Sequence, residues 1–111
     1  MKRIIFALCV SLLILPRAHA AEKETVCAKY RADYGWSKGY KVEATILKGG
    51  ELNQATRTFN YNSLSTYVVI FWDKDQASVI EMNWPYLSPI GQEGEDQRGI
   101  KWEIAKTTIC F

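Results

Sequence analysis

Apolar and polar side chains alternate along much of this chain, and that pattern predicts β-strands. Residues 41–47 place apolar side chains at every second position, which is typical of a strand with one buried face. Gly49 and Gly50 follow directly, and paired glycines at the end of a strand predict a turn. Residues 57–61 alternate less regularly and predict a second strand.

A longer apolar run marks the centre of the predicted sheet. Residues 67–72 are apolar throughout, with β-branched and aromatic types, so we expect this strand to be covered on both faces. Four polar residues, 73–76, separate it from a β-type run over residues 77–84, which predicts a hairpin. Residues 100–105 alternate again, and residues 26–34 are compatible with a helix or a strand, of which we favour the strand. About six antiparallel strands in roughly ninety residues predict an all-β fold, a small barrel or sandwich.

One stretch, residues 85–99, has no period of either kind. It contains two prolines and three glycines, and connections of this length are usually functional or mobile. We therefore expect a surface loop that folding does not require. The three tryptophans within strand patterns, Trp72, Trp84 and Trp102, are by contrast expected in the core.

The first twenty residues predict an export signal. Two basic residues precede an uncharged apolar run over residues 4–15, and residues 18–20 read Ala-His-Ala, which has the form of a cleavage site. An apolar run of about twelve residues is shorter than the roughly twenty that a membrane-spanning helix needs. We therefore expect residues 1–20 to be removed as a signal peptide and residues 21–111 to form a single exported domain, periplasmic or secreted, without a stable membrane anchor.

Removal of the signal peptide would change the composition of the chain. Three of the 14 basic residues precede residue 21, so the exported domain would hold 11 basic and 12 acidic residues, a net charge of −1. This charge lacks the clustered excess of lysine and arginine that is typical of nucleic-acid-binding proteins. His19, the only histidine, would also be lost, which excludes a Ser-His-Asp triad, a Cys-His pair and an imidazole zinc site. We expect no catalytic residues, no cofactor, no metal site and no nucleic-acid partner.

Two cysteines would remain, Cys27 and Cys110, near the two ends of the exported domain. An even pair of cysteines in a short exported domain predicts a disulfide. On the chain-entropy account, closing so long a loop stabilises the fold by about 4 to 5 kcal/mol. That contribution is comparable to the whole net stability of a small domain.

Aromatic side chains gather before the first clear strand. Tyr30, Tyr34, Trp36 and Tyr40 surround two glycines, and their polar neighbours suggest a loop. Exposed tyrosine and tryptophan in loops suit protein partners or stacking on sugar rings. The alternative is that these rings close one end of a barrel over its core.

A family resemblance adds to this interpretation. Residues 67–74 read Tyr-Val-Val-Ile-Phe-Trp-Asp-Lys, residues 77–79 read Ala-Ser-Val, and the two cysteines lie near the ends of the domain. In these features the chain resembles the periplasmic and membrane-bound inhibitors of C-type lysozyme. The resemblance implies a small β-barrel with a disulfide that joins its ends and a Phe-Trp-x-Lys segment. It also implies that Lys74 corresponds to a lysine that contacts a catalytic acid of the enzyme.

The second motif of that family, a Ser-Gly loop upstream of the lysine, is absent. Asn60 stands at its place, and the nearest serines, Ser63 and Ser65, have no glycine beside them. The chain therefore departs from the family pattern at one of the two motifs that the inhibitors use.

Taken together, these patterns predict a monomeric domain that binds a protein partner in the cell envelope. The role we expect is that of an inhibitor or immunity-type protein acting on an enzyme such as a lysozyme. The candidate binding residues are Lys74, Asp73, Asp75, Ser63, Ser65, Trp36 and Tyr40. The alternative function is carbohydrate or peptidoglycan binding through a flat row of exposed rings, and a carboxylate enzyme with two facing acids in a pocket is the third.

Overall fold

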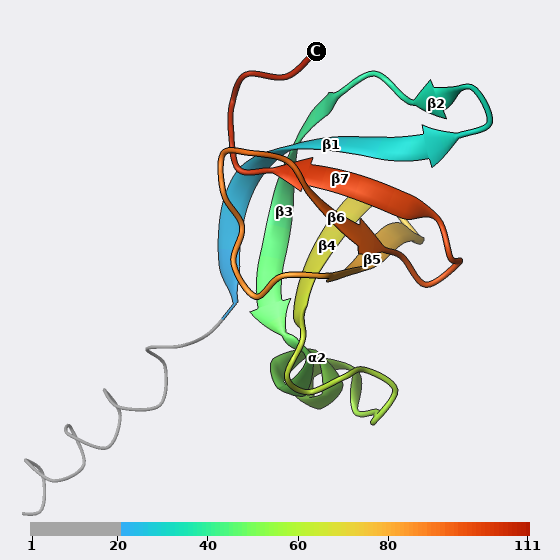
Figure 1. Ribbon diagram of the computed structural model, residues 1–111. Coiled ribbons are helices and arrows are strands. Elements are labelled where there is room, and N and C mark those ends of the chain that lie inside the picture. The colour runs from blue at the N-terminus through green and yellow to red at the C-terminus, as the bar shows by residue number, and fades with distance from the viewer. Residues whose placement is uncertain (1–20) are drawn as a thin grey trace, which may run out of the picture.

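The structure is a computed structural model that describes residues 21–111, so the predicted signal peptide lies outside the described residues. Six antiparallel strands form a closed barrel, which confirms the all-β fold (Figure 1). In chain order these strands are β1 (Glu22–Ala32), β3 (Tyr40–Lys48), β4 (Thr66–Asp73), β5 (Gln76–Met82), β6 (Gln92–Glu95) and β7 (Lys101–Ala105). β7 pairs with β6 and with β1, and the second pairing closes the barrel. A two-residue strand, β2 (Gly35–Trp36), pairs only with the end of β1.

Alternation along the strands fills the interior of the barrel with apolar side chains. In β1, Val26 and Ala28 are fully buried, and in β7 the side chains of Trp102 and Ile104 are buried in the same way. The other buried members of this core are Ala44, Val68, Ile70, Ile80 and Met82. At about 25 cal/mol per Å² of apolar surface removed from water, such a core is the main favourable contribution to folding.

Five of the predicted strands are present, including the one over residues 26–34, whose pattern is also compatible with a helix. Residues 26–34, 41–47, 67–72, 77–84 and 100–105 correspond to β1, β3, β4, β5 and β7, and β4 and β5 form the predicted hairpin. β4 is covered on both faces only as far as Ile70, because Phe71 is 73% exposed. The prediction of a core position is confirmed for Trp102 but is wrong for Trp84, which follows the end of β5 and is 62% exposed, and for Trp72, which is 37% exposed near the end of β4.

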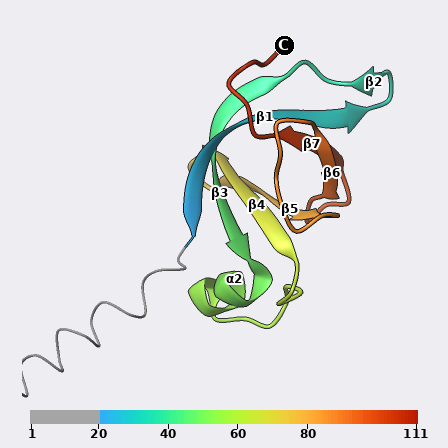
Figure 2. The same cartoon turned by 60° about the vertical axis from the view of Figure 1, so that its left-hand side comes forward.

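The turn predicted at residues 49–50 is wrong, because the helix α2 (Gly49–Thr56) begins there. The Glu51 carboxylate accepts a 3.0 Å hydrogen bond from the backbone N–H of Lys48, which supports the first turn of the helix. Leu52 then packs against the outer face of β4. α2 lies below the barrel at the end of β3 in both views (Figure 1, Figure 2). No helix within residues 21–111 is long and apolar enough to cross a membrane.

The strand predicted at residues 57–61 is also wrong, because these residues form an irregular loop. Arg57 ends α2 in the left-handed backbone conformation, with φ of 57°. The Asn53 side chain then holds Tyr61 by two hydrogen bonds of 3.0 Å, one to its carbonyl oxygen and one from its backbone N–H. The alternation of this segment does not reflect burial, since Phe59 is 97% exposed.

Residues 85–99 are not a loop throughout, because they contain β6, which joins β5 to β7 in the barrel wall. Gly94 in this strand is buried. A Cβ at Gly94 would lie 2.6 Å from the Glu81 carbonyl oxygen and 2.8 Å from the Ile80 side chain. The inward position of β6 is therefore filled by glycine, which leaves no apolar periodicity to detect.

The predicted disulfide is confirmed, since Cys27 in β1 is bonded to Cys110 with their Cα atoms 5.3 Å apart. Gly39 lies against this bond, and a Cβ there would be 2.6 Å from both sulfur atoms. The backbone N–H of Gly39 also donates a 2.7 Å hydrogen bond to the Phe111 carbonyl oxygen. The end of the chain is thus tied to the segment that precedes β3.

Candidate functional site

One end of the barrel carries most of its aromatic residues. Because neighbouring strands are antiparallel, the ends of β1, β4 and β6 meet the starts of β3, β5 and β7 there. Tyr30, Tyr40, Trp72 and Trp102 come from four of these strands, and we call this region the aromatic end. The β1–β2 hairpin, the β4–β5 turn and the β6–β7 turn connect strands at the same end.

The four rings of the aromatic end pack on one another. Trp72 and Trp102 stack with ring centroids 5.7 Å apart. Tyr40 meets the Trp72 ring edge-on at 5.9 Å, and Tyr30 meets the Trp102 ring edge-on at 5.6 Å. Such pairs stabilise a fold by about 0.5 to 1.5 kcal/mol beyond the burial of their area. Trp102 is 4% exposed and Trp72 is 37% exposed, and Tyr30 and Tyr40 are half-buried. The cluster therefore covers the core with Trp102 and leaves the other three rings partly at the surface.

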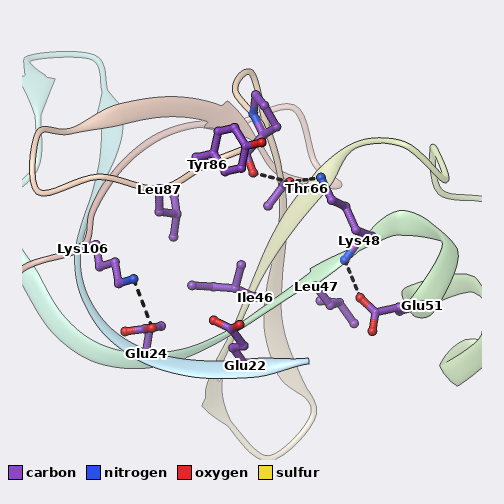
Figure 3. Close-up of a pocket in the computed structure, with 11 residues that line it drawn as sticks. Glu22, Glu24, Ile46, Leu47, Lys48, Glu51, Thr66, Tyr86, Leu87 and Lys106 are labelled. Carbon is purple, nitrogen blue, oxygen red and sulfur yellow. Dashed lines mark hydrogen bonds and ion pairs between the residues drawn. The ribbon is translucent and has the colours of Figure 1, made fainter. Parts of the chain in front are cut away.

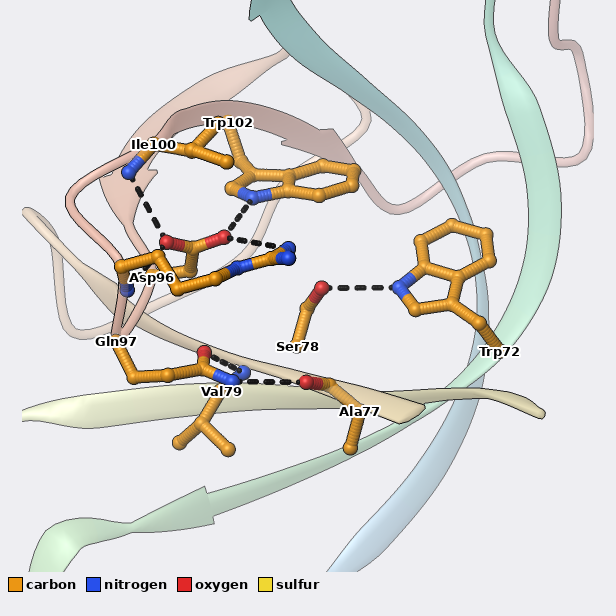
Figure 4. A network of polar contacts seen from close by, with 9 residues as sticks. Trp72, Ala77, Ser78, Val79, Asp96, Gln97, Ile100 and Trp102 are labelled. Atoms are coloured by element: carbon orange, nitrogen blue, oxygen red, sulfur yellow. Dashed lines mark hydrogen bonds and ion pairs between the residues drawn. The ribbon is translucent and has the colours of Figure 1, made fainter. Parts of the chain in front are cut away.

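Two buried polar side chains hold the tryptophan rings in place (Figure 4). The Trp72 indole N–H donates a 2.9 Å hydrogen bond to Oγ of Ser78, which is fully buried. The Trp102 indole N–H donates a 2.9 Å hydrogen bond to Oδ2 of Asp96, which is 6% exposed. A buried donor without a partner is costly, so these pairs fix the rings in a single arrangement.

Asp96 organises the β6–β7 turn as well as the ring. Its Oδ1 accepts the backbone N–H groups of Arg98 and Ile100 at 2.8 and 3.0 Å. Burial alone would raise the pKa of Asp96, but the hydrogen bonds from the Trp102 indole and from these backbone groups favour the charged form. The Arg98 guanidinium, 3.6 Å from Oδ2, acts in the same direction. The pKa of Asp96 is therefore below its usual value.

Asp96 and Ser78 are not among the candidate residues predicted from the sequence. For Asp96 a signal was present, because aspartate followed by glycine three residues later is typical of a turn. For Ser78 there was none, since a serine within a strand pattern does not indicate which side chain it bonds.

Lys74 lies in the β4–β5 turn, between Asp73 and Asp75, and all three residues are exposed. The Asp73 carboxylate accepts a 2.7 Å hydrogen bond from the Lys74 backbone N–H. Asp75 has a positive φ of 69°, which aspartate tolerates better than most residues. The two acids therefore shape a tight turn in which Lys74 is exposed, two residues after Trp72 in the chain.

Trp36 and Tyr40 lie at the same end as Lys74, but each has a cation on its ring. The Arg31 guanidinium is 5.6 Å from the Trp36 ring centroid, and the Lys38 ammonium is 5.2 Å from the Tyr40 ring centroid. Both distances are within the range of cation–π attraction. Burial raises the pKa of the Tyr40 hydroxyl, and the neighbouring tyrosines act in the same direction. Each of these two rings therefore has one face next to a cation.

Ser63 and Ser65 lie at the opposite end of the barrel from Lys74. Both serines precede β4 and Lys74 follows it. The strand between them has 8 residues, and at about 3.3 Å per residue a strand of that length spans roughly 25 Å. The Ser65 hydroxyl donates a 2.6 Å hydrogen bond to the Glu81 carboxylate. The structure thus gathers five of the candidate residues at the aromatic end and leaves the two serines away from them.

The end of the barrel near the serines holds a cavity of about 320 Å³ (Figure 3). Both lysines in its wall are engaged with neighbours. The Lys106 ammonium is 3.3 Å from the Glu24 carboxylate. Lys48 Nζ donates a 3.1 Å hydrogen bond to Oγ1 of Thr66, and the Thr66 hydroxyl donates to the Pro85 carbonyl oxygen at 2.9 Å.

The carboxylates of this cavity do not suggest a catalytic pair. Glu24 is paired with Lys106 and Glu51 accepts the Lys48 backbone N–H, so Glu22 alone among them has no such partner within the described residues. Carboxylate catalysis of glycoside hydrolysis requires two acids that face each other across the bond. Nor does the described part of the chain contain a group of three or more histidine, cysteine, aspartate or glutamate side chains suited to a metal ion.

The aromatic end is therefore the best candidate for a functional surface. It combines an exposed lysine, a partly exposed tryptophan and a hairpin across which the Trp72 indole is hydrogen-bonded to the buried Ser78 hydroxyl. Tryptophan and tyrosine are among the residues that dominate the energetics of protein interfaces. No protein-family model, curated protein or solved structure matches the chain.

Proposed function

We propose that this chain is an exported protein-binding domain of the cell envelope that inhibits, or confers immunity to, an enzyme with an acidic cleft, such as a C-type lysozyme. The β4–β5 hairpin enters the cleft, and Lys74 pairs there with a carboxylate of the enzyme. The observation that supports this proposal is the position of Lys74 in a tight, exposed turn next to Trp72.

Several contacts within the domain hold the hairpin before it meets a partner. The Trp72 ring is held by its hydrogen bond to Ser78 and by its stack on Trp102, and Asp73 holds the backbone of the turn. Binding therefore requires little ordering of the hairpin, and preorganisation of this kind increases affinity. Phe71, 73% exposed on the same hairpin, adds apolar surface for the partner.

The charge of Lys74 is available for a partner. The ion pairs within residues 21–111 join Arg98 to Asp96 and Lys106 to Glu24, and neither uses Lys74. A charge pair that becomes desolvated in an interface can contribute strongly to affinity and to the choice of partner. The disulfide suits the oxidising compartment in which such an enzyme would be met.

The direct test is inhibition of a purified C-type lysozyme by the purified protein. Lys74→Ala should raise the concentration needed for half inhibition by about tenfold or more, because losing one partner of a desolvated charge pair costs about 2 kcal/mol or more. Lys74→Arg should retain most of the inhibition. Lys23→Ala is the matched control, since Lys23 is an exposed lysine near the start of β1, at the other end of the barrel.

Two outcomes would contradict the proposal. The lysozyme version is excluded if the wild-type protein does not inhibit at micromolar concentration. The role of the hairpin is excluded if Lys74→Ala and Lys23→Ala inhibit equally well. The melting temperature of each variant, measured in parallel, separates loss of binding from loss of folding.

A further inference from the structure

One edge of β5 is covered by a strand along only part of its length. β6 pairs with the end of β5 through Glu81 and Glu95 and through Met82 and Gly94. Beyond Glu95 the chain leaves the sheet and turns toward β7, since the Asp96 backbone N–H bonds to the Ile100 carbonyl oxygen at 2.9 Å. The first half of β5, nearest the hairpin, therefore has no strand beside it on this edge.

The side chain of Gln97 occupies this free edge instead (Figure 4). Its Oε1 accepts the backbone N–H of Val79 at 2.9 Å, and its Nε2 donates to the Ala77 carbonyl oxygen at 2.8 Å. Continuing the β5–β6 register would place Gln97 opposite Val79. The carboxamide thus offers β5 one acceptor and one donor, as the peptide groups of a neighbouring strand would. Both hydrogen bonds are exposed to solvent.

The surface next to this edge is acidic. A cavity of about 360 Å³ lies there and includes Val79 and Gln97 in its wall. Glu81 and Glu95 also line it, and no lysine or arginine does. Arg98, in the adjoining turn, is already paired with Asp96.

We propose that the free edge of β5 is a docking site for an extended polypeptide segment that carries basic side chains. The segment adds to the sheet as a strand, and its backbone replaces the Gln97 carboxamide at Ala77 and Val79. Main-chain hydrogen bonds supply affinity in this mode of recognition, and side chains at alternate positions supply specificity. Glu81 and Glu95 select for lysine or arginine at those positions. Gln97 leaves by rotation of its own side chain and protects the edge while no partner is present.

This site is separate from the proposed action of Lys74 and is tested without any lysozyme. The probe is a capped ten-residue peptide of alternating threonine and lysine, titrated into the isotope-labelled protein while the backbone amide signals are followed. The Val79 and Ala77 signals should shift with the wild-type protein. Gln97→Ala should bind the peptide about tenfold more tightly, because two exposed hydrogen bonds of modest net strength no longer compete.

Two matched controls isolate the backbone contribution. Gln54→Ala removes an exposed glutamine of α2 and should leave the affinity for the peptide unchanged. The same peptide with N-methyl groups along one edge keeps its charge but cannot pair as a strand, and it should not bind. This peptide comparison can be made on the wild-type protein, so it remains decisive even if Gln97→Ala fails to fold.

Three results would overturn the proposal. The first is that neither the wild-type protein nor Gln97→Ala binds the peptide at millimolar concentration. The second is equal binding of the N-methylated peptide, which would show a purely electrostatic contact. The third is dimerisation of Gln97→Ala through Ala77 and Val79, detected by sedimentation, which would show that the edge accepts a second copy of this chain instead.

Discussion

The indole N–H of Trp102 donates a 2.9 Å hydrogen bond to Oδ2 of Asp96, so a ring of the barrel core is tied to a carboxylate that also accepts two backbone N–H groups of the β6–β7 turn. Trp102 in turn stacks on Trp72, which precedes Lys74 by two residues. The buried carboxylate and the exposed hairpin are thus connected by two packed rings. Changes at Asp96 should therefore affect both stability and the aromatic end.

Asp96→Ala should lower the free energy of unfolding by about 3 kcal/mol at neutral pH, because it leaves buried donors without an acceptor. Urea unfolding followed by tryptophan fluorescence measures this change. Asp96→Asn should cost less, since its amide oxygen can still accept the N–H groups of Arg98 and Ile100. An unfolding free energy of Asp96→Ala within 0.5 kcal/mol of the wild type, roughly the range of an ordinary surface substitution, would contradict this role.

Low pH should also remove the contribution of the charged Asp96 carboxylate to stability. The pKa of Asp96 in the folded protein is lower than its usual value of 3.8. The charged carboxylate therefore stabilises the fold at every pH above that value, and this stabilisation is lost as the pH falls through the folded pKa. The wild-type protein should lose more stability than Asp96→Asn between pH 5 and pH 2, roughly the window in which such a carboxylate titrates. Parallel pH profiles of the two proteins would refute this assignment.

The contact between Gly39 and the disulfide predicts that the stability cost of a substitution at Gly39 depends on whether the disulfide is present. Gly39→Ala should destabilise the oxidised protein by about 1 to 3 kcal/mol, because its Cβ would press on both sulfur atoms. In the Cys27→Ser/Cys110→Ser background, which by itself should cost about 2 to 5 kcal/mol, the same substitution should cost clearly less. Equal costs in the two backgrounds would mean that Gly39 is required for another reason.

β6 should be essential to the barrel. Gly94→Ala should lower the free energy of unfolding by about 1 to 3 kcal/mol, because there is no room for a Cβ beside β5. Replacing residues 93–96 by glycine and serine should abolish the cooperative thermal transition, since it removes the buried Asp96 and weakens the strand that links β5 to β7. Circular dichroism melts measure both effects. Gly91→Ala is a useful comparison, because the nearest neighbour of its Cβ would be the flexible Glu103 side chain and not backbone.

Loss of the buried Ser78 hydroxyl should lower the stability of the hairpin without changing any side chain on its exposed surface. Ser78→Ala should cost about 1 kcal/mol of stability, because the Trp72 indole N–H loses its partner. Trp72 is partly exposed, so its fluorescence should shift to the red as the ring gains water. An unchanged emission spectrum would show that stacking on Trp102 alone holds the ring.

The parts of the fold that could be predicted are those where one side chain in two faces the core. Strands β3, β5 and β7 follow such alternation, and β4 is apolar over most of its length. The disulfide followed from the number of cysteines and their placement. Strand alternation can be read from neighbouring residues, and a disulfide can be predicted from the presence of two cysteines.

The parts that were missed depend on contacts between distant segments. α2 begins at two glycines because Gly49 lies against the backbone of Asn62, where a Cβ would collide. β6 is short and has glycine at its buried position. The loop of residues 57–61 is held by the Asn53 side chain. None of these contacts leaves a periodic pattern in the sequence.

The candidate site shows the same division. Lys74 and its two flanking aspartates were placed in a turn from the polar interruption between two strands, and they lie in one. The two serines lie at the other end of the barrel because β4 separates them from Lys74. Alternation predicts the strand but does not show which candidate residues come together in space. Asp96 and Ser78 act through hydrogen bonds to tryptophan rings six residues away in the chain, and each bond depends on how the chain turns between two strands.

The most direct test of the proposed binding surface is to titrate a C-type lysozyme into the isotope-labelled protein and to map the changes in its backbone amide signals. The largest changes are expected at residues 72–76, with smaller changes at Lys38 and Tyr40, and all of them should disappear with Lys74→Ala. The proposed surface is contradicted if the largest changes surround the cavity that contains Lys48 and Lys106, or if no signal changes at a saturating concentration of the enzyme.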